Sequence, residues 1–167
     1  MVRLLQRLWR HWLAQLRPAR RLLPAAALAQ IEAQIRAAEA THAGEIRVVV
    51  ETSLSFLQLC HALSARARAV QLFAALHVWD TAHNNGVLVY VLLADRAIEI
   101  VADRAIAAHI PAAEWAALCA EVAERFRQGD AAAGCCVAVR CVGLRMARYF
   151  PAAGGDSNEL PNQPVLL

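Results

Sequence analysis

The chain contains no lysine, and its 17 basic residues are all Arg. It also has little glycine and proline, with 7 and 6 in 167 residues, which excludes collagen-like and low-complexity classes. Charged residues make up only 19% of the chain and hydrophobic residues 59%, which excludes disorder over most of it. The length then suits one domain with a short appendage.

Long hydrophobic runs are missing as well. The purest run, residues 86–94, has strand length, whereas a membrane-spanning helix needs about 18 or more apolar residues. Arg recurs through residues 1–21, where a secretory signal would need a continuous apolar core. The sequence therefore predicts a cytoplasmic protein, with peripheral attachment to the inner membrane face as an open alternative.

The cysteines lack any C-x-x-C spacing, and their number is odd. Three of them fall in segments that we expect to be helical. We therefore expect reduced, small core residues rather than a metal–thiolate site or a catalytic thiol. The five are Cys60, Cys119, Cys135, Cys136 and Cys141.

Positive charge is concentrated at the N-terminus. Residues 1–24 hold six Arg and no acid, whereas the rest of the chain holds 11 Arg and 14 acids. The arm is therefore basic and the body mildly acidic, which argues against a body built to bind nucleic acid.

The basic arm carries an apolar stripe. Large apolar residues recur at helical spacing until Pro18, and residues 17–24 resemble a linker. Trp on the apolar side and Arg on the flanks suit a helix lying on an anionic membrane surface. Packing on the chain's own domain or on a protein partner is the alternative, and nucleic acid fits less well. The stripe comprises Met1, Leu4, Leu5, Leu8, Trp9, Trp12, Leu13 and Leu16.

The remaining pattern predicts alternating helices and strands. A strand–helix–strand unit implies parallel neighbours with a right-handed crossover, and a tight turn adds an antiparallel third strand. We expect an α/β fold, a three-layer α/β/α sandwich around a small mixed sheet, with an extra N-terminal amphipathic helix. Helices are predicted at 24–40, 64–76, 103–109, 111–128 and 129–150, and strands at 45–51, 86–93 and 97–101.

The same pattern predicts three parts of the chain. Residues 1–23 form the basic helix and linker, 24–151 the α/β domain, and 152–167 an irregular tail. Residues 52–63 are expected to be an irregular connection. The expected inward side chains are Ala69, Val70, Phe73 and Leu76 in one helix and Val137, Cys141 and Leu144 in the last.

Several short motifs follow one another along the body. They are G-E-I-R at 44–47, N-N-G-V-L-V-Y-V-L-L-A-D-R-A-I-E-I-V-A-D at 84–103, F-R-Q-G-D-A-A-A-G at 126–134, Y-F-P at 149–151 and N-E-L-P at 158–161. In these motifs the chain resembles the TPM domain family, and most of all its stand-alone bacterial members. The resemblance covers roughly residues 25–164.

The resemblance implies an α/β/α sandwich. In the family that the chain resembles, plant members are associated with acid phosphatase activity and photosystem II repair. Several bacterial members are associated with divalent cations, calcium among them. Two departures concern the loops. Relatives often have glycine soon after the acid that matches Asp103, where this chain has Arg104-Ala105, and many carry Arg in place of Asn84.

The topology gathers polar residues at one edge of the sheet, where two parallel strands start and the third ends. Carboxylate and amide oxygens suit a hard cation, so the sequence predicts a divalent-cation site for calcium or magnesium. The alternative is structural, with these residues pairing with Arg, capping a helix or holding a turn. The candidate ligands are Glu45, Asp80, Thr81, Asn85 and Asp103.

Two functions follow as expectations. The first is a cation-binding TPM protein with phosphatase-like hydrolysis, in which the metal activates water and His42 or His83 acts as acid or base. No C-x5-R loop, D-x-D-x-T motif or Gly-rich phosphate cradle supports hydrolysis. The second is a non-enzymatic accessory factor that docks through residues 1–23.

Overall fold

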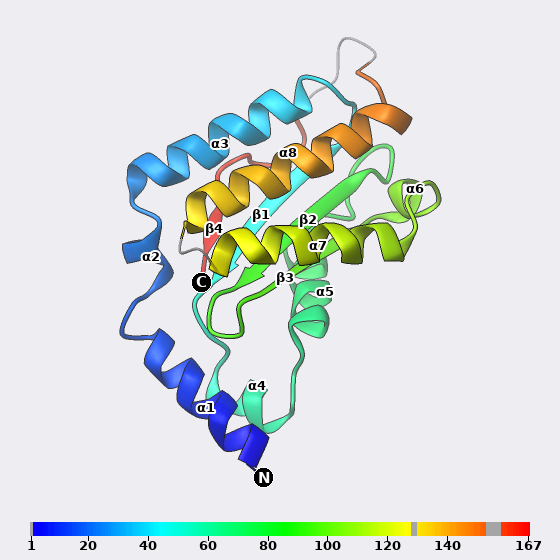
Figure 1. Cartoon of the computed structure of the whole chain (residues 1–167). Coiled ribbons are helices and arrows are strands. Elements are labelled where there is room, and N and C mark those ends of the chain that lie inside the picture. The colour runs from blue at the N-terminus through cyan, green and yellow to red at the C-terminus, as the bar shows by residue number, and fades with distance from the viewer. Residues whose placement is uncertain (1, 128–129, 153–157) are drawn as a thin grey trace.

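Figure 1 shows the computed structural model, which describes residues 2–127, 130–152 and 158–167. Its helices are α1 (Val2–Ala14), α2 (Ala19–Leu22), α3 (Ala25–Glu39), α4 (Phe56–Cys60), α5 (Ala65–Ala75), α6 (Arg104–Ala107), α7 (Ala112–Arg127) and α8 (Ala131–Tyr149). Its strands are β1 (Glu45–Glu51), β2 (Gly86–Leu92), β3 (Ala97–Ala102) and β4 (Val165–Leu166).

The sheet has the strand order β3-β2-β1-β4. β1 pairs in parallel with β2, with Glu45 opposite Gly86, and β3 returns antiparallel to β2. The tail was expected to be irregular, but its end forms β4, which pairs in parallel with β1 at Val49 and Val50. The reason is that β1 would otherwise leave the backbone groups of an edge strand unpaired.

Helices cover both faces of the sheet (Figure 1), so the predicted α/β/α sandwich with an added N-terminal helix is confirmed. Ile46, Val48 and Val50 of β1 belong to the core beneath α3, α7 and α8. Val49 points to the other face, where the core includes Leu72 of α5. Both faces of β1 and β2 are buried, which explains their continuous apolar sequences.

The last helix buries a different stripe from the one predicted. Val137 and Cys141 are only partly buried, and Leu144 is 68% exposed. A Cβ added at Gly143 would lie 2.8 Å from the Ala38 Cβ, so small residues set the close contact between α8 and α3. The buried stripe is Gly134, Cys135, Ala138, Val139, Val142, Gly143 and Met146.

In α5 the inward face also differs in part. Ala69 is buried and Phe73 partly buried, as predicted, but Val70 is 48% exposed and Leu72 is buried. Leu76 follows the helix and is partly buried. Ser64 caps the helix by accepting a hydrogen bond from the Ala67 N–H.

Two segments expected to be irregular contain short helices. In the linker, α2 places Ala19 and Leu23 in the core, and the Ala19 N–H donates to Thr52 Oγ1 at 2.9 Å. Between β1 and α5, α4 is capped by Ser55, whose side chain forms a capping box with Gln58. The S-x-x-Q spacing was the available sequence signal.

The cysteines form no disulfide, although Cys60 is exposed rather than in the core. None of the described helices has the length and hydropathy needed to cross a bilayer.

Candidate functional site

Helix α1 contacts the body through polar side chains. The His11 side chain is almost fully buried, its Nδ1 accepts the Leu54 N–H at 2.9 Å, and its Nε2 lies 3.1 Å from Asp95 Oδ1. Arg7 donates to Asp95 Oδ2 from Nε at 3.0 Å and from Nη2 at 2.8 Å. Asp95, in the turn between β2 and β3, therefore holds α1 against the body.

The charges in this contact are well defined. Burial lowers the pKa of His11, more than the nearby Asp95 carboxylate raises it. Burial alone would raise the pKa of Asp95, but the hydrogen bond from Arg7, the positive charge of Arg7 and the adjacent His11 ring bring it below its usual range. Neutral His11 therefore accepts the Leu54 N–H on Nδ1, while Arg7 and Asp95 form the ion pair.

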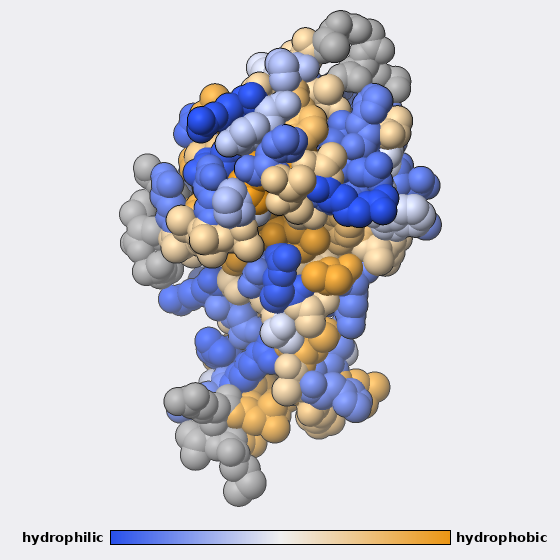
Figure 2. All heavy atoms as spheres, turned by 90° about the vertical axis from the view of Figure 1, so that its right-hand side faces the viewer, coloured by the Kyte–Doolittle hydropathy of each residue, from blue (hydrophilic) through white to orange (hydrophobic). Residues whose placement is uncertain are grey.

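The opposite side of α1 is exposed and apolar. Leu5, Trp9 and Trp12 are 62%, 60% and 55% exposed, and the two Trp rings stack with centroids 5.0 Å apart. Helix α4 packs beside α1 and exposes Phe56 and Leu57 at 67% and 69%. We call these five residues the outer face. Figure 2 shows hydrophobic atoms among hydrophilic ones at this lower end of the molecule.

The predicted apolar stripe therefore divides. Leu8 packs against the body, whereas Leu4, Leu13 and Leu16 are 39%, 39% and 59% exposed along with the outer face. The side of α1 that is buried against the body therefore contains His11 and Leu8, and it includes only one margin of the predicted stripe.

At the predicted edge of the sheet, four of the five candidate ligands, all but the exposed Asp80, have a local structural role. Both oxygens of the buried Glu45 carboxylate accept tail N–H groups at 3.1 Å, from Glu159 and Leu160. Thr81 Oγ1 accepts the Asn85 N–H at 3.1 Å. Asp103 caps α6 by accepting the Arg104 N–H, and Asp80 and His83 are exposed.

These residues do not converge on one point. Glu45 and Asp103 flank Gly86 on the same face, and the Val78 carbonyl fills the space above Gly86, where a Cβ would lie 2.0 Å from it. Asn85 points to the opposite face and donates to the Ala43 carbonyl. No group of three His, Cys, Asp or Glu able to hold a metal occurs among the described residues.

Two oxygens at this edge stand out. Asp103 Oδ2 and Asn85 Oδ1 are buried without a hydrogen-bond partner in the described part of the chain. Strand alternation places them on opposite faces of the sheet, so one cation does not serve both.

A hollow of about 620 Å³ lies between the end of α3 and the tail, and its lining includes Glu39, His42, Glu45 and Asn162. Glu39 Oε1 accepts the Ile46 N–H at 2.9 Å, and Glu39 Oε2 accepts Asn162 Nδ2 at 2.5 Å. His42 is 1% exposed, and its Nδ1 accepts the Gly44 N–H.

Glu39 and Asn162 are the site residues that the sequence analysis missed. The N-E-L-P motif ends one residue before Asn162 and was the available signal for the tail. Glu39 lies inside the predicted helix 24–40, where it had no distinguishing pattern.

The electrostatics of the hollow centre on Glu39. Burial raises the pKa of Glu39 to about 7; the hydrogen bonds from Ile46 and Asn162 oppose the rise, and the charge of Glu45 adds to it. Two carboxyl groups thus share the hollow, and burial favours the neutral form of Glu39.

Comparisons with known proteins agree with this architecture. The BA42 protein of Bizionia argentinensis has a solved structure that is 30% identical, with a TM-score of 0.75 over 86% of this chain and 94% of that one. The N-terminal domain of a P. gingivalis protein is 20% identical, with a TM-score of 0.62 over 77% and 79% of the two chains, and shares the fold. No curated protein matches the chain. The family profile of the TPM domain matches residues 19–143, three quarters of the sequence, and the chain belongs to the TPM domain family.

Proposed function

We propose that this TPM-domain protein attaches peripherally to an anionic membrane surface through the outer face. The supporting observation is that α1 is held to the body by its polar side, which leaves Leu5, Trp9 and Trp12 in solvent. Exposed Arg17, Arg20 and Arg21 follow directly along the chain. Trp among apolar residues with Arg on the flanks is typical of helices that lie in the membrane interface.

Two forces favour this attachment. Removing a large apolar side chain from water contributes up to about 2 kcal/mol, and each Arg near an anionic surface contributes about 1 kcal/mol. The ionic part is screened by salt. The helix is already formed and positioned in the free protein, so binding requires little additional ordering.

Cosedimentation with vesicles tests the proposal. Wild type is expected to bind vesicles of phosphatidylcholine with phosphatidylglycerol, to bind pure phosphatidylcholine more weakly, and to lose affinity as salt rises. The double variant Trp9→Gln/Trp12→Gln is expected to bind at least about tenfold more weakly, because it removes the apolar anchor.

The matched control is Leu144→Gln, at an apolar residue that is slightly more exposed than the two Trp but lies on α8. It should bind as wild type does. Equal binding by the Trp variant would contradict the proposal. The proposal would also be contradicted if size-exclusion chromatography showed a dimer for wild type and Leu144→Gln but a monomer for the Trp variant. The outer face would then contact a second copy of the chain.

We also propose a divalent cation in the hollow, the second candidate function. The supporting observation is the Glu39–Glu45 pair, whose repulsion helps to raise the pKa of Glu39 and which a cation would relieve. Asn162 Oδ1 lies beside them, buried without a hydrogen-bond partner among the described residues. Carboxylate and amide oxygens are the donors that calcium and magnesium prefer.

Thermal melts test the cation. At pH 8, where Glu39 is ionised, one of Ca²⁺, Mg²⁺, Mn²⁺ and Zn²⁺ is expected to raise Tm. The unfolding free energy should increase with the logarithm of the cation concentration, by about 2.7 kcal/mol at a hundred times Kd. The pKa of Glu39 is about 7 in the folded state, against 4.5 for an ordinary glutamate, so the folded state holds an extra proton between these values. Unfolding free energy without cation should therefore fall as pH rises through that window. Cation affinity should rise over the same window.

Glu39→Gln and Glu45→Gln should abolish the rise in Tm, whereas Asp103→Asn, at the other end of the predicted ligand set, should retain it. No rise with any cation would refute this candidate. Phosphatase-like hydrolysis rests on the family resemblance alone, and a screen with p-nitrophenyl phosphate becomes informative once a cation is identified.

A further inference from the structure

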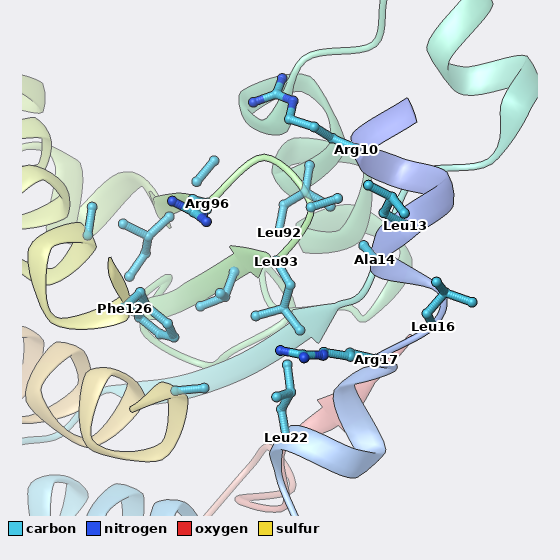
Figure 3. Close-up of a pocket in the computed structure, with 16 residues that line it drawn as sticks. Arg10, Leu13, Ala14, Leu16, Arg17, Leu22, Leu92, Leu93, Arg96 and Phe126 are labelled. Carbon is cyan, nitrogen blue, oxygen red and sulfur yellow. The ribbon is translucent and has the colours of Figure 1, made fainter. Parts of the chain in front are cut away.

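A groove of about 860 Å³ separates α1 and α2 from the β2–β3 hairpin and reaches Phe126 of α7 (Figure 3). Its lining is mainly apolar, and its volume is typical of small-molecule sites. Leu13, near the end of α1, turns toward it, and Leu16 follows the helix at the rim of the groove. Its larger apolar side chains include those of Leu13, Leu22, Leu92, Leu93, Ile98 and Phe126.

The polar groups of the groove all carry the same charge. Arg10, Arg17 and Arg96 line it, with no acid among the described lining residues. Arg10 Nη2 lies 3.2 Å from Asp95 Oδ1, a carboxylate that also contacts Arg7 and His11. Arg17 and Arg96 form no ion pair with any residue that the structure describes. In Figure 3 the Arg17 side chain extends from the connection between α1 and α2 toward the space between Leu93 and Leu22.

The backbone at Arg96 adds to this observation. Its φ is 51°, in the left-handed region that glycine or asparagine adopts at lower cost. The turn between β2 and β3 nevertheless presents a cationic side chain to the groove.

We propose that this groove binds a single-chain fatty acid. The acyl chain lies along the apolar lining, and Arg17 and Arg96 supply the positive charge that the carboxylate meets. An Arg guanidinium matches a carboxylate in geometry and charge, and forms stronger hydrogen bonds with it than with a neutral head. The single acyl chain of a fatty acid complements the one apolar groove, and its single negative charge complements the guanidinium groups of Arg17 and Arg96.

The inference does not rest on membrane attachment, because the groove and the outer face use different residues. Binding is therefore measured without vesicles, by calorimetry with monomeric laurate below its micelle concentration. We expect saturable binding of one laurate per chain. Each CH₂ added from octanoate to laurate should tighten Kd by up to about fourfold. Dodecyltrimethylammonium, with the same tail and the opposite charge, should bind at least about tenfold more weakly.

Variants locate the ligand. Arg17→Gln/Arg96→Asn should weaken laurate binding at least about tenfold, and Asn at position 96 tolerates the positive φ. Ala14→Trp should block the groove while keeping its charge. Arg20→Gln is the matched control, because it removes a charge from the same basic arm at a residue that does not line the groove.

Four results would overturn the proposal. They are no saturable binding of laurate, equal affinity for the cationic amphiphile, unchanged binding in Arg17→Gln/Arg96→Asn, and loss of laurate binding in the outer-face variant Trp9→Gln/Trp12→Gln. Binding only to phospholipid vesicles would also overturn it, while leaving the membrane proposal intact.

Discussion

Replacing Gly86 with Ala is expected to destabilise the protein by about 3 kcal/mol or more, the upper end of overpacking in a core. The added Cβ would lie 2.0 Å from the Val78 carbonyl oxygen and 3.1 Å from its carbon. Relief requires the backbone of the 77–85 loop to move away from β2, because no flexible side chain can yield. Thermal and urea unfolding should show Tm about 10 °C lower, with the transition still cooperative.

Gly134→Ala is the matched control. There the added Cβ meets the Phe126 ring at 2.7 Å, and a side chain can turn where a carbonyl cannot. Ala also gains helix propensity of up to about 1 kcal/mol in α8. We expect a change within about 1 kcal/mol. Equal losses from the two substitutions would show that the loop over Gly86 is not a rigid contact.

Glu51→Ala is expected to cost about 3 kcal/mol, because it removes one partner from a buried charged network. Glu51 is 5% exposed and accepts Arg68 Nε and Nη2, each at 2.9 Å, and the Tyr90 hydroxyl at 2.7 Å. Burial and this hydrogen bond raise the pKa of Tyr90, so its hydroxyl stays a donor. Without Glu51, Arg68 is left half-buried without its acid.

The control for Glu51 is Glu32→Ala, which breaks the exposed Glu32–Arg36 pair one turn apart on α3. Its effect on unfolding free energy should stay within about 0.5 kcal/mol. A double-mutant cycle with Glu51→Leu and Arg68→Leu separates the pair from its neighbours, and the double variant should recover part of the loss. A Glu51 effect as small as that of Glu32 would show that solvent already screens the network.

The two central strands of this fold were predictable because their sequences are unambiguous. Residues 45–51 and 86–92 are β-branched or apolar runs bounded by polar residues, and both strands form where expected. Ser64, Asp103 and Asp130 cap helices, each within one residue of a predicted helix start. These features depend on residues close together in sequence.

The face of α8 could not be predicted in the same way. That helix is apolar almost all round, so its periodicity has little contrast, and the close approach at Gly143 decides which side is buried. The sequence left the orientation of α1 open for another reason. Its partner is a polar turn, and Asp95 lies 88 residues from Arg7 in sequence, a distance at which local patterns carry no information.

The site shows both limits. The topology correctly placed Glu45 and Asp103 beside the same edge, but it could not show that the Val78 carbonyl separates them. Nor could it show that the Glu45 carboxylate accepts a hydrogen bond from the backbone N–H of Glu159, a tail residue 114 positions later.

The position of β4 at the outer edge of β1 has a consequence for biosynthesis. Val165 and Leu166 are translated more than a hundred residues after the strand they pair with. At ribosomal rates of about 5–20 residues per second, β1 emerges roughly ten seconds before its neighbour exists. During that interval its free edge is a template for pairing with another nascent chain on the same polysome. We therefore expect chaperone demand to be set by the interval between the two strands, and slow codons after residue 51 to lower the yield of folded protein.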